Sequence, residues 1–352
     1  MSRFLSARHN ALAAYTPGEQ PADMQYIKLN TNESPYPPSP AVLAALQNDE
    51  LKRLNLYPNP DGTALLNKIA EAYKVRQENV IIGNGSDELL AFAFLAFFDG
   101  GVVFPDITYG FYPVYGNLYN LPFTEISVND ELAVNVSDYI GIGKNVVLAN
   151  PNAPTGIALE LCDIEAIAEN NPNHIVLIDE AYVDFGADSV VELTKKYDNL
   201  LVLHTFSKSR SMAGARLAYA IASKPIIDDM QKMKYSFNPY NVNRLTQTLG
   251  LAALSDACYY EKKQREIAET RDYTAVRLSN LGFEMTNSKA NFLFARSPRI
   301  GGEELYLKLK QKGILIRHFN KPRIADYVRI TVGTKEQMES LITAVTEVLQ
   351  KP

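Results

Sequence analysis

The feature of the sequence that most limits its fold is a series of short apolar runs separated by longer segments with helical periodicity. The runs occupy residues 79–83, 101–104, 145–149, 174–179, 200–204 and 217–222. Unbroken runs of Val, Ile and Leu are typical of strands that are buried on both faces. Strands that alternate with helices need crossover connections, which make neighbouring strands parallel. The sequence therefore predicts an α/β fold with a mostly parallel central sheet and helices on both faces.

The pattern changes after about residue 243, where a long charge-rich helical segment begins and runs to Leu281. Three short strands are then expected, at residues 291–294, 314–317 and 327–331. We therefore expect three parts: an N-terminal segment that packs on the small domain and the substrate site, a large α/β domain and a small α+β domain. Their expected ranges are 1–45, 46–245 and 246–352.

Composition excludes several classes of protein. The net charge of −5 argues against bulk nucleic-acid binding, which needs a basic surface. The longest apolar stretch, 89–98, is shorter than the roughly 20 residues that a membrane helix requires. Cys162 and Cys258 are the only cysteines, and the four histidines are scattered, so no metal site is expected. The N-terminus lacks the apolar core of a secretory signal, so we expect a cytoplasmic protein without nucleic-acid or membrane partners.

A glycine-rich turn with Gly85, Ser86 and Asp87 follows the first predicted strand and opens a predicted helix. Backbone amides at a helix N-terminus bind anions, and glycines let an anion approach closely. The turn has neither dinucleotide-site nor P-loop spacing, so it suits a single phosphate. The alternative is an ordinary turn in which Ser86 or Asp87 caps the helix.

Three further polar segments lie where predicted strands end. Asp179 and Tyr182 follow one strand, where a carboxylate could meet a protonated heterocycle or could belong to a solvated acidic loop. Asn152 lies in a turn that two prolines and a glycine make rigid, although a plain turn would look the same. Tyr109 lies in an aromatic turn after another strand.

Lys208 follows the strand expected at 200–204, between hydroxyl residues that include Thr205 and Ser207, with Arg216 eight residues farther on. A lysine whose surroundings remove its proton can form an imine with an aldehyde, and an arginine can bind a phosphate. Taken alone, Lys208 could equally be a surface lysine.

The order of these segments is more specific than any one of them, because every one falls at a predicted strand end. A ligand with one phosphate, a basic ring nitrogen, a phenolic oxygen and an aldehyde would use them all. Pyridoxal 5′-phosphate has these four groups, so we expect this cofactor.

With these segments in place, the sequence resembles the fold-type I pyridoxal-phosphate aminotransferases, and specifically the histidinol-phosphate aminotransferase family. The resemblance covers nearly the whole chain and depends most on the segments 15–21, 28–40, 57–62 and 327–334. It implies transamination between L-histidinol phosphate and 2-oxoglutarate, which gives imidazole acetol phosphate and glutamate in histidine biosynthesis. It also implies a homodimer with shared active sites.

The resemblance implies roles for individual residues. Lys208 corresponds to the lysine that binds the cofactor aldehyde and moves the proton, and Asp179 corresponds to the partner of the ring nitrogen. Tyr182 and Asn152 are assigned to the phenolic oxygen, and Tyr109 to the aromatic side chain stacked on the ring. The residues assigned to the cofactor phosphate are Gly85, Ser86, Asp87, Thr205, Ser207 and Arg216.

Other residues are assigned to the substrate and to the neighbouring subunit. Arg329 and Arg317 resemble the arginines that bind the substrate anion, and Asn32 and Tyr15 are expected beside them. Bidentate guanidinium groups could accept a phosphate and then a carboxylate in alternate half-reactions. The alternative for both arginines is a solvated surface ion pair. Tyr57 resembles a residue that reaches the cofactor phosphate of the other subunit.

The sequence departs from the family pattern at two positions. Ala153 stands directly before Pro154 where many fold-type I enzymes have Asn, and the role is therefore assigned to Asn152. Ser34 replaces a family Asn in the N-terminal segment.

Three other functions stay open. Two are an aromatic or broad-specificity aminotransferase and a threonine-phosphate decarboxylase, which would use the same cofactor residues. The third is a non-catalytic protein that binds pyridoxal phosphate.

Overall fold

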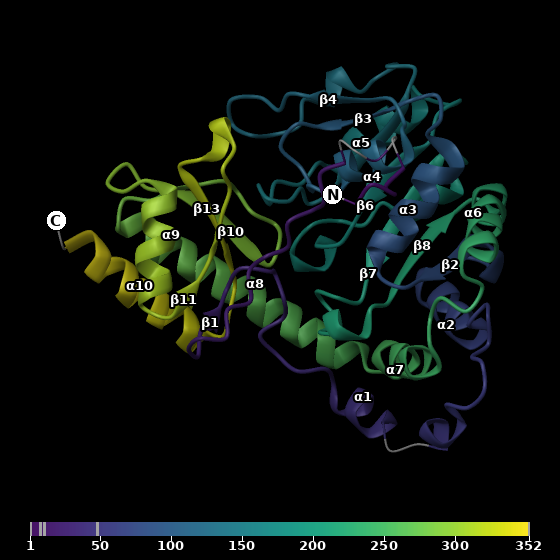
Figure 1. Cartoon of the computed structure of the whole chain (residues 1–352), viewed down its shortest axis with the longest axis horizontal. Coiled ribbons are helices and arrows are strands. Elements are labelled where there is room, and N and C mark those ends of the chain that lie inside the picture. The colour runs from purple at the N-terminus through teal and green to yellow at the C-terminus, as the bar shows by residue number, and fades with distance from the viewer. Residues whose placement is uncertain (1, 7–8, 10–11, 47–48, 351–352) are drawn as a thin grey trace.

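The larger part of the molecule is organised around a seven-stranded sheet (Figure 1). The structure is a computed structural model that describes residues 2–6, 9, 12–46 and 49–350. Its strands, in spatial order, are β2 (Val80–Gly83), β8 (Ala218–Ala222), β7 (Leu200–Thr205), β6 (Val176–Asp179), β5 (Asn145–Ala149), β3 (Val102–Pro105) and β4 (Phe123–Ile126). Only β8 runs antiparallel to its neighbours, and the other pairs are parallel. The predicted α/β fold with a mostly parallel sheet is confirmed.

Helices cover both faces of this sheet, and consecutive strand residues explain why. Val147 and Leu177 pack in one apolar layer, whereas Val146 and Ile178 pack in the other, because side chains alternate along a strand. The first layer contains helices α3 (Ser86–Phe97), α4 (Tyr112–Tyr119) and α6 (Lys224–Phe237). The second contains α2 (Thr63–Tyr73), α5 (Leu161–Glu169) and α7 (Arg244–Ser255).

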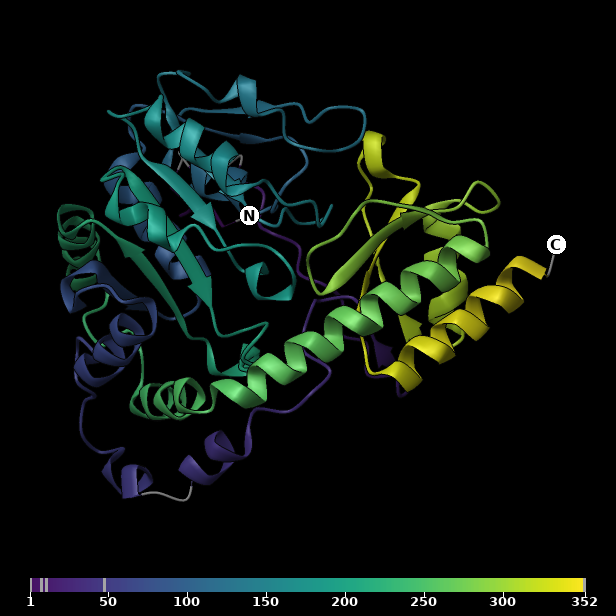
Figure 2. The ribbon, with the colours of Figure 1, turned by 180° about the vertical axis from the view of Figure 1, so that it is seen from behind.

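A smaller antiparallel sheet forms the rest of the molecule, in the order β12 (Arg317–His318), β13 (Tyr327–Thr331), β10 (Phe292–Arg296) and β9 (Glu284–Met285). Three helices pack with it in one apolar core: α8 (Ala257–Asn280), α9 (Gly302–Gln311) and α10 (Lys335–Gln350). Figure 2 shows α8 running from the larger part of the molecule to the smaller one. The expected division at residues 45 and 245 stays a prediction.

The N-terminal segment joins both parts of the molecule. Its strand β1 (Ile27–Lys28) pairs in parallel with β11 (Ile314–Leu315) of the smaller part, and α1 (Pro40–Ala45) then lies near α7 (Figure 1). Between β1 and α1 the chain passes the carboxyl ends of the large sheet, where Thr31 contacts Lys208.

Neither a helix long and apolar enough to span a membrane nor a cluster of three potential metal-binding side chains occurs within the described residues. Cys162 and Cys258 are exposed and free.

Candidate active site

A cavity of about 340 Å³ lies at the carboxyl ends of β5, β6 and β7, beside the N-terminus of α3. Parallel strands end at one edge of a sheet, so residues far apart in sequence meet there. The sequence-predicted residues on its wall are Ser86, Asp87, Tyr109, Asp179, Tyr182, Thr205, Ser207, Lys208 and Arg216.

One end of this cavity is built to bind an anion. Helix α3 begins at Ser86 with its first backbone amides near the Arg216 guanidinium, whose Nη2 lies 3.1 Å from Asp87 Oδ2. Gly85 has a φ of 81°, and a Cβ there would collide with Arg216. The alternative that Ser86 or Asp87 caps the helix is wrong, because the N-cap residue of α3 is Gly85. A helix N-terminus with a guanidinium group suits a phosphate.

Asp179, the last residue of β6, is only 5% exposed, so the solvated-loop alternative is wrong. Its Oδ2 accepts a hydrogen bond from Tyr112 Oη at 3.1 Å, and its Oδ1 accepts one from the Ala181 amide at 3.2 Å. Burial raises the pKa of Asp179 to about 6, although these two bonds act against the shift. A cationic ligand group at this carboxylate would favour its ionised form.

Lys208 projects from the turn after β7 toward the N-terminal segment. Its Nζ donates a hydrogen bond to the Thr31 carbonyl at 3.2 Å and lies 5.8 Å from the centre of the Tyr182 ring. Lys208 is part-buried and forms no ion pair with another described residue. Its amine can therefore reach a ligand in the cavity, which argues against an ordinary surface lysine.

The aromatic residues on the wall are held by polar contacts. Tyr109 donates a hydrogen bond to Asp87 Oδ1 at 2.9 Å. The Tyr182 hydroxyl accepts one from Asn32 Nδ2 at 3.0 Å, which brings the N-terminal segment to the cavity.

Asn152 lies behind the wall, to which the neighbouring Ala153 contributes instead. Its Nδ2 donates to the Ile107 carbonyl at 2.9 Å and to Thr155 Oγ1 at 3.0 Å, so both amide protons are used within the protein. Its Oδ1 accepts from Thr108 Oγ1 at 2.8 Å. Contact between Asn152 and a ligand stays a prediction, and it requires one of these bonds to break.

A second cavity of about 640 Å³ adjoins the first and shares Tyr109, Tyr182, Lys208 and Arg216 with it. Its wall also carries the predicted residues Tyr15, Asn32, Arg317 and Arg329, together with Lys321. Among the described residues that form this wall there is no carboxylate.

Arg329 is the most constrained cation of the second cavity. Its Nη2 donates to the Asn30 carbonyl at 3.1 Å, and its guanidinium carbon lies 5.4 and 5.6 Å from the ring centres of Phe292 and Phe319. Its Nε is buried without a hydrogen-bond partner in the described chain, and burial lowers the pKa of Arg329. This is not a solvated surface arginine, and it is suited to an anionic ligand.

The remaining predicted residues differ in their placement. Arg317 donates to the Pro17 and Thr16 carbonyls at 3.4 and 3.3 Å and so holds the N-terminal segment against the cavity. The ring of Tyr15 lies 4.6 Å from that of Phe111, and burial raises the pKa of Tyr15. Tyr57 lines neither cavity of its own chain, and it is 77% exposed.

Sequence reasoning missed Thr31 and Glu33 on the wall of the first cavity, and the fully buried Tyr112, which donates a hydrogen bond to Asp179. Tyr112 follows Tyr109 by three residues at the start of a helix, and that spacing could have indicated a shared site. Thr31 and Glu33 come from the N-terminal segment, and no local pattern places them beside Lys208.

Comparison with known proteins agrees with this geometry. The model for "aminotransferase class I and II" matches residues 24–345. The chain is 47% identical to the histidinol-phosphate aminotransferase of Brachyspira hyodysenteriae, over 99% of this chain and 100% of that protein. It is 46% identical to that of Lactococcus lactis, over 97% and 95% of the two chains.

Solved structures show the same fold. A putative histidinol-phosphate aminotransferase from Erwinia carotovora atroseptica is 26% identical, with a TM-score of 0.85 over 93% of this chain and 96% of that one. The histidinol-phosphate aminotransferase of Sinorhizobium meliloti, solved in complex with pyridoxal-5′-phosphate, is 21% identical, with a TM-score of 0.89 over 99% and 98%. The resemblance inferred from the sequence is thus confirmed, and the chain belongs to the class I and II aminotransferase family.

Proposed function

We propose that this protein transfers an amino group between L-histidinol phosphate and 2-oxoglutarate, in histidine biosynthesis, with pyridoxal 5′-phosphate as its cofactor. The observation that carries the proposal is the pair of adjoining cavities. One has a lysine, a buried carboxylate and a phosphate-sized anion site, and the other has cations and no carboxylate among the described residues. Relatives that are 42–47% identical to this chain over nearly their whole length are named histidinol-phosphate aminotransferase.

The first cavity fits the cofactor group by group. The start of α3 with Arg216 and Ser207 would hold the phosphate, and Asp179 would face the ring nitrogen. Tyr109 would stack on the ring, and the Tyr182 hydroxyl would donate to the phenolic oxygen. When bound, the cofactor supplies an electron sink for the bonds of the substrate's α-carbon. Asp179 keeps that sink effective by holding the ring nitrogen protonated.

Lys208 carries the acid–base chemistry in this proposal. Its amine would hold the cofactor through the aldehyde and, when free, would take the proton from the substrate's α-carbon and return it. The Thr31 carbonyl accepts a hydrogen bond from Nζ at 3.2 Å and so limits where the free amine can point.

The second cavity would hold the anionic end of each substrate. Arg329, Arg317 and Lys321 place positive charge on a wall without carboxylates in the part of the chain described. A substrate phosphate, and then a carboxylate of glutamate, could receive hydrogen bonds from the Arg329 guanidinium in turn.

We further propose a cytoplasmic homodimer whose interface includes an exposed apolar patch. The exposed apolar side chains that we assign to it are Leu51, Leu54, Leu56, Tyr57, Tyr235, Phe237 and Tyr240. Tyr57 stacks on Tyr240 with 4.4 Å between ring centres, which brings the two segments together. An exposed patch of this kind marks an interaction surface. We infer that Tyr57 serves the phosphate site of the other subunit.

Two experiments test these proposals. Purified enzyme should convert histidinol phosphate and 2-oxoglutarate to glutamate, faster than it acts on histidinol or phenylalanine and without releasing CO₂ from threonine phosphate. Preference for phenylalanine, or CO₂ release, would contradict the assigned reaction.

For the dimer, Lys208→Ala and Tyr57→Ala subunits are unfolded and refolded together. A mixed dimer then has one intact site if Tyr57 acts across the interface, so activity should recover. Mixed dimers without recovered activity, or a monomeric enzyme, would contradict the shared site.

A further inference from the structure

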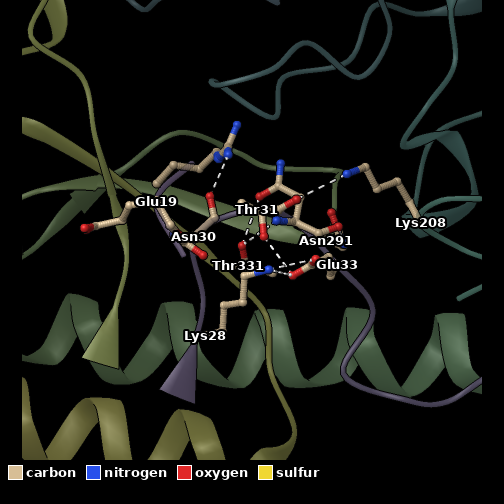
Figure 3. A network of polar contacts seen from close by, with 10 residues as sticks. Glu19, Lys28, Asn30, Thr31, Glu33, Lys208, Asn291 and Thr331 are labelled. Atoms are coloured by element: carbon tan, nitrogen blue, oxygen red, sulfur yellow. Dashed lines mark hydrogen bonds and ion pairs between the residues drawn. The ribbon is translucent and has the colours of Figure 1, made fainter. Parts of the chain in front are cut away.

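Residues 27–33, which we call the strap, lie between the two parts of the molecule and contact both (Figure 3). On one side β1 pairs with β11, and the Arg329 guanidinium donates to the Asn30 carbonyl. On the other side the Thr31 carbonyl accepts the bond from Lys208. An internal ion pair between Lys28 and Glu33, at 2.7 Å, closes the strap on itself.

Asn32 is the residue of the strap with the most connections. It is 1% exposed and has a φ of 56°, a left-handed conformation that Asn adopts more readily than most residues. Its backbone amide donates to Thr331 Oγ1 at 2.9 Å, and its carbonyl accepts from Asn291 Nδ2 at 3.0 Å. Its Oδ1 accepts from Thr331 Oγ1 at 3.0 Å, and its Nδ2 donates to the Tyr182 hydroxyl oxygen at 3.0 Å.

These bonds fix the direction of the Asn32 amide. A backbone N–H can only donate, so Thr331 Oγ1 accepts from it and gives its own proton to Asn32 Oδ1. That bond leaves Nδ2 to face Tyr182. Because the tyrosine oxygen accepts from Nδ2, its own proton is free to point elsewhere, and the wall of the first cavity includes Tyr182.

We propose that Asn32 is a positioning residue, which acts through Tyr182 and not by contact with substrate. It holds the tyrosine oxygen from behind and so directs the hydroxyl proton to the phenolic oxygen of the cofactor. Through Thr331, whose hydroxyl orients the Asn32 amide, it also makes this hydrogen bond depend on the docking of the smaller sheet. The inference rests on the proposed role of Tyr182. It matters more in this chain because Asn152 uses both amide protons elsewhere.

The test compares Asn32→Gly, which keeps the left-handed backbone accessible, in the wild-type and Tyr182→Phe backgrounds. A donor to the phenolic oxygen stabilises that oxygen as an anion, so its loss raises the pH at which the bound cofactor's absorbance titrates. Asn32→Gly should raise this midpoint by about one pH unit and weaken cofactor binding to the apoprotein about tenfold, on the scale of one hydrogen bond to a charged group. In the Tyr182→Phe background, the same substitution should change neither quantity.

Asn291→Ala is the matched control, because it loosens the strap without touching the bond between Asn32 and Tyr182. It should leave the midpoint at its wild-type value. An equal shift in Asn291→Ala, or an equal effect of Asn32→Gly in both backgrounds, would overturn the inference. So would a change confined to the KM of histidinol phosphate, since Asn32 would then be a substrate contact.

Two further outcomes separate this inference from the proposals on which it rests. If Tyr182→Phe alone leaves the titration unchanged, the assignment of Tyr182 fails, and the inference fails with it. If the enzyme fails to turn over histidinol phosphate, only the proposed substrate is refuted, and the role of Asn32 is still decided by the titration. If thermal unfolding shows that Asn32→Gly does not fold, Thr331→Val replaces it. That variant removes the proton that orients Asn32 and should shift the midpoint in the same direction, and an unshifted midpoint would overturn the inference.

Discussion

Replacing Arg329 by Lys tests how the second cavity recognises an anion, because lysine keeps the charge and removes the two-pronged donor. Arg329 donates to the Asn30 carbonyl through Nη2, and its buried Nε has no partner among the described residues. A guanidinium has five N–H donors in a fixed fork, so a docked anion can receive two parallel hydrogen bonds from it. Lysine can supply only one, and each hydrogen bond with a charged partner contributes about 1.5–3 kcal/mol. Binding of histidinol phosphate and of glutamate should weaken about 10- to 150-fold.

The assay is the dissociation constant of each substrate, together with its KM, for Arg329→Lys and for Arg317→Lys as the matched comparison. Arg317 already donates to two carbonyls of the N-terminal segment, so its replacement should cost less, about fivefold or below. Cofactor affinity and the thermal unfolding temperature should stay near wild-type values in both variants. If Arg329→Lys binds both substrates as the wild type does, the anion site lies elsewhere and the reasoning is wrong.

Three further predictions concern the first cavity. Lys208→Ala should abolish turnover while the protein still folds, and borohydride should no longer fix the cofactor to the chain; near-normal transamination would refute the role of Lys208. Asp179→Asn should lower turnover at least about 100-fold. In the apoprotein, the raised pKa of Asp179 means that the folded state holds this proton more tightly than the unfolded state does. The free energy of unfolding should therefore fall by about 3 kcal/mol as the pH rises from about 4 to 6, and denaturation of Asp179→Asn at each pH should not show this decrease. Gly85→Ala should displace Arg216 and weaken cofactor binding more than tenfold, whereas Gly100→Ala, which has open space at its Cβ and lines neither cavity, should not.

Much of the fold could be predicted because the central strands are buried on both faces and stand out as unbroken apolar runs. The edge strand β4 was missed because its sequence, Phe-Thr-Glu-Ile, is partly exposed and polar. The strand expected at 314–317 is two strands, β11 and β12, which belong to different sheets. The helical segment that ends near Leu281 is likewise divided, at Asp256, into α7 and α8.

The site was predictable to the extent that its residues follow strands, since strand order alone brings strand ends together. Side-chain direction was not predictable in the same way. The Asn152 side chain is held behind the cavity wall because Thr155 in its own turn and Ile107 after β3 both offer acceptors. The bond between Asn32 and Tyr182 joins residues 150 positions apart, and its geometry depends on Thr331, which is a further 149 positions along the chain. No local pattern encodes such a contact.

Asp179 and Arg329 place opposite charges in the two cavities, and neither forms an ion pair with another described residue. Burial without a counterion disfavours both charges, as the directions of their pKa shifts show. A protonated ring nitrogen would neutralise one charge and a substrate anion the other. Charges that destabilise the unliganded chain therefore become the source of selectivity, because a neutral ligand leaves the guanidinium unpaired. Ligands that supply the missing charges also stabilise the folded state by mass action. The unpaired charges of Asp179 and Arg329 thus mark the positions where we expect the cofactor and the substrate to bind.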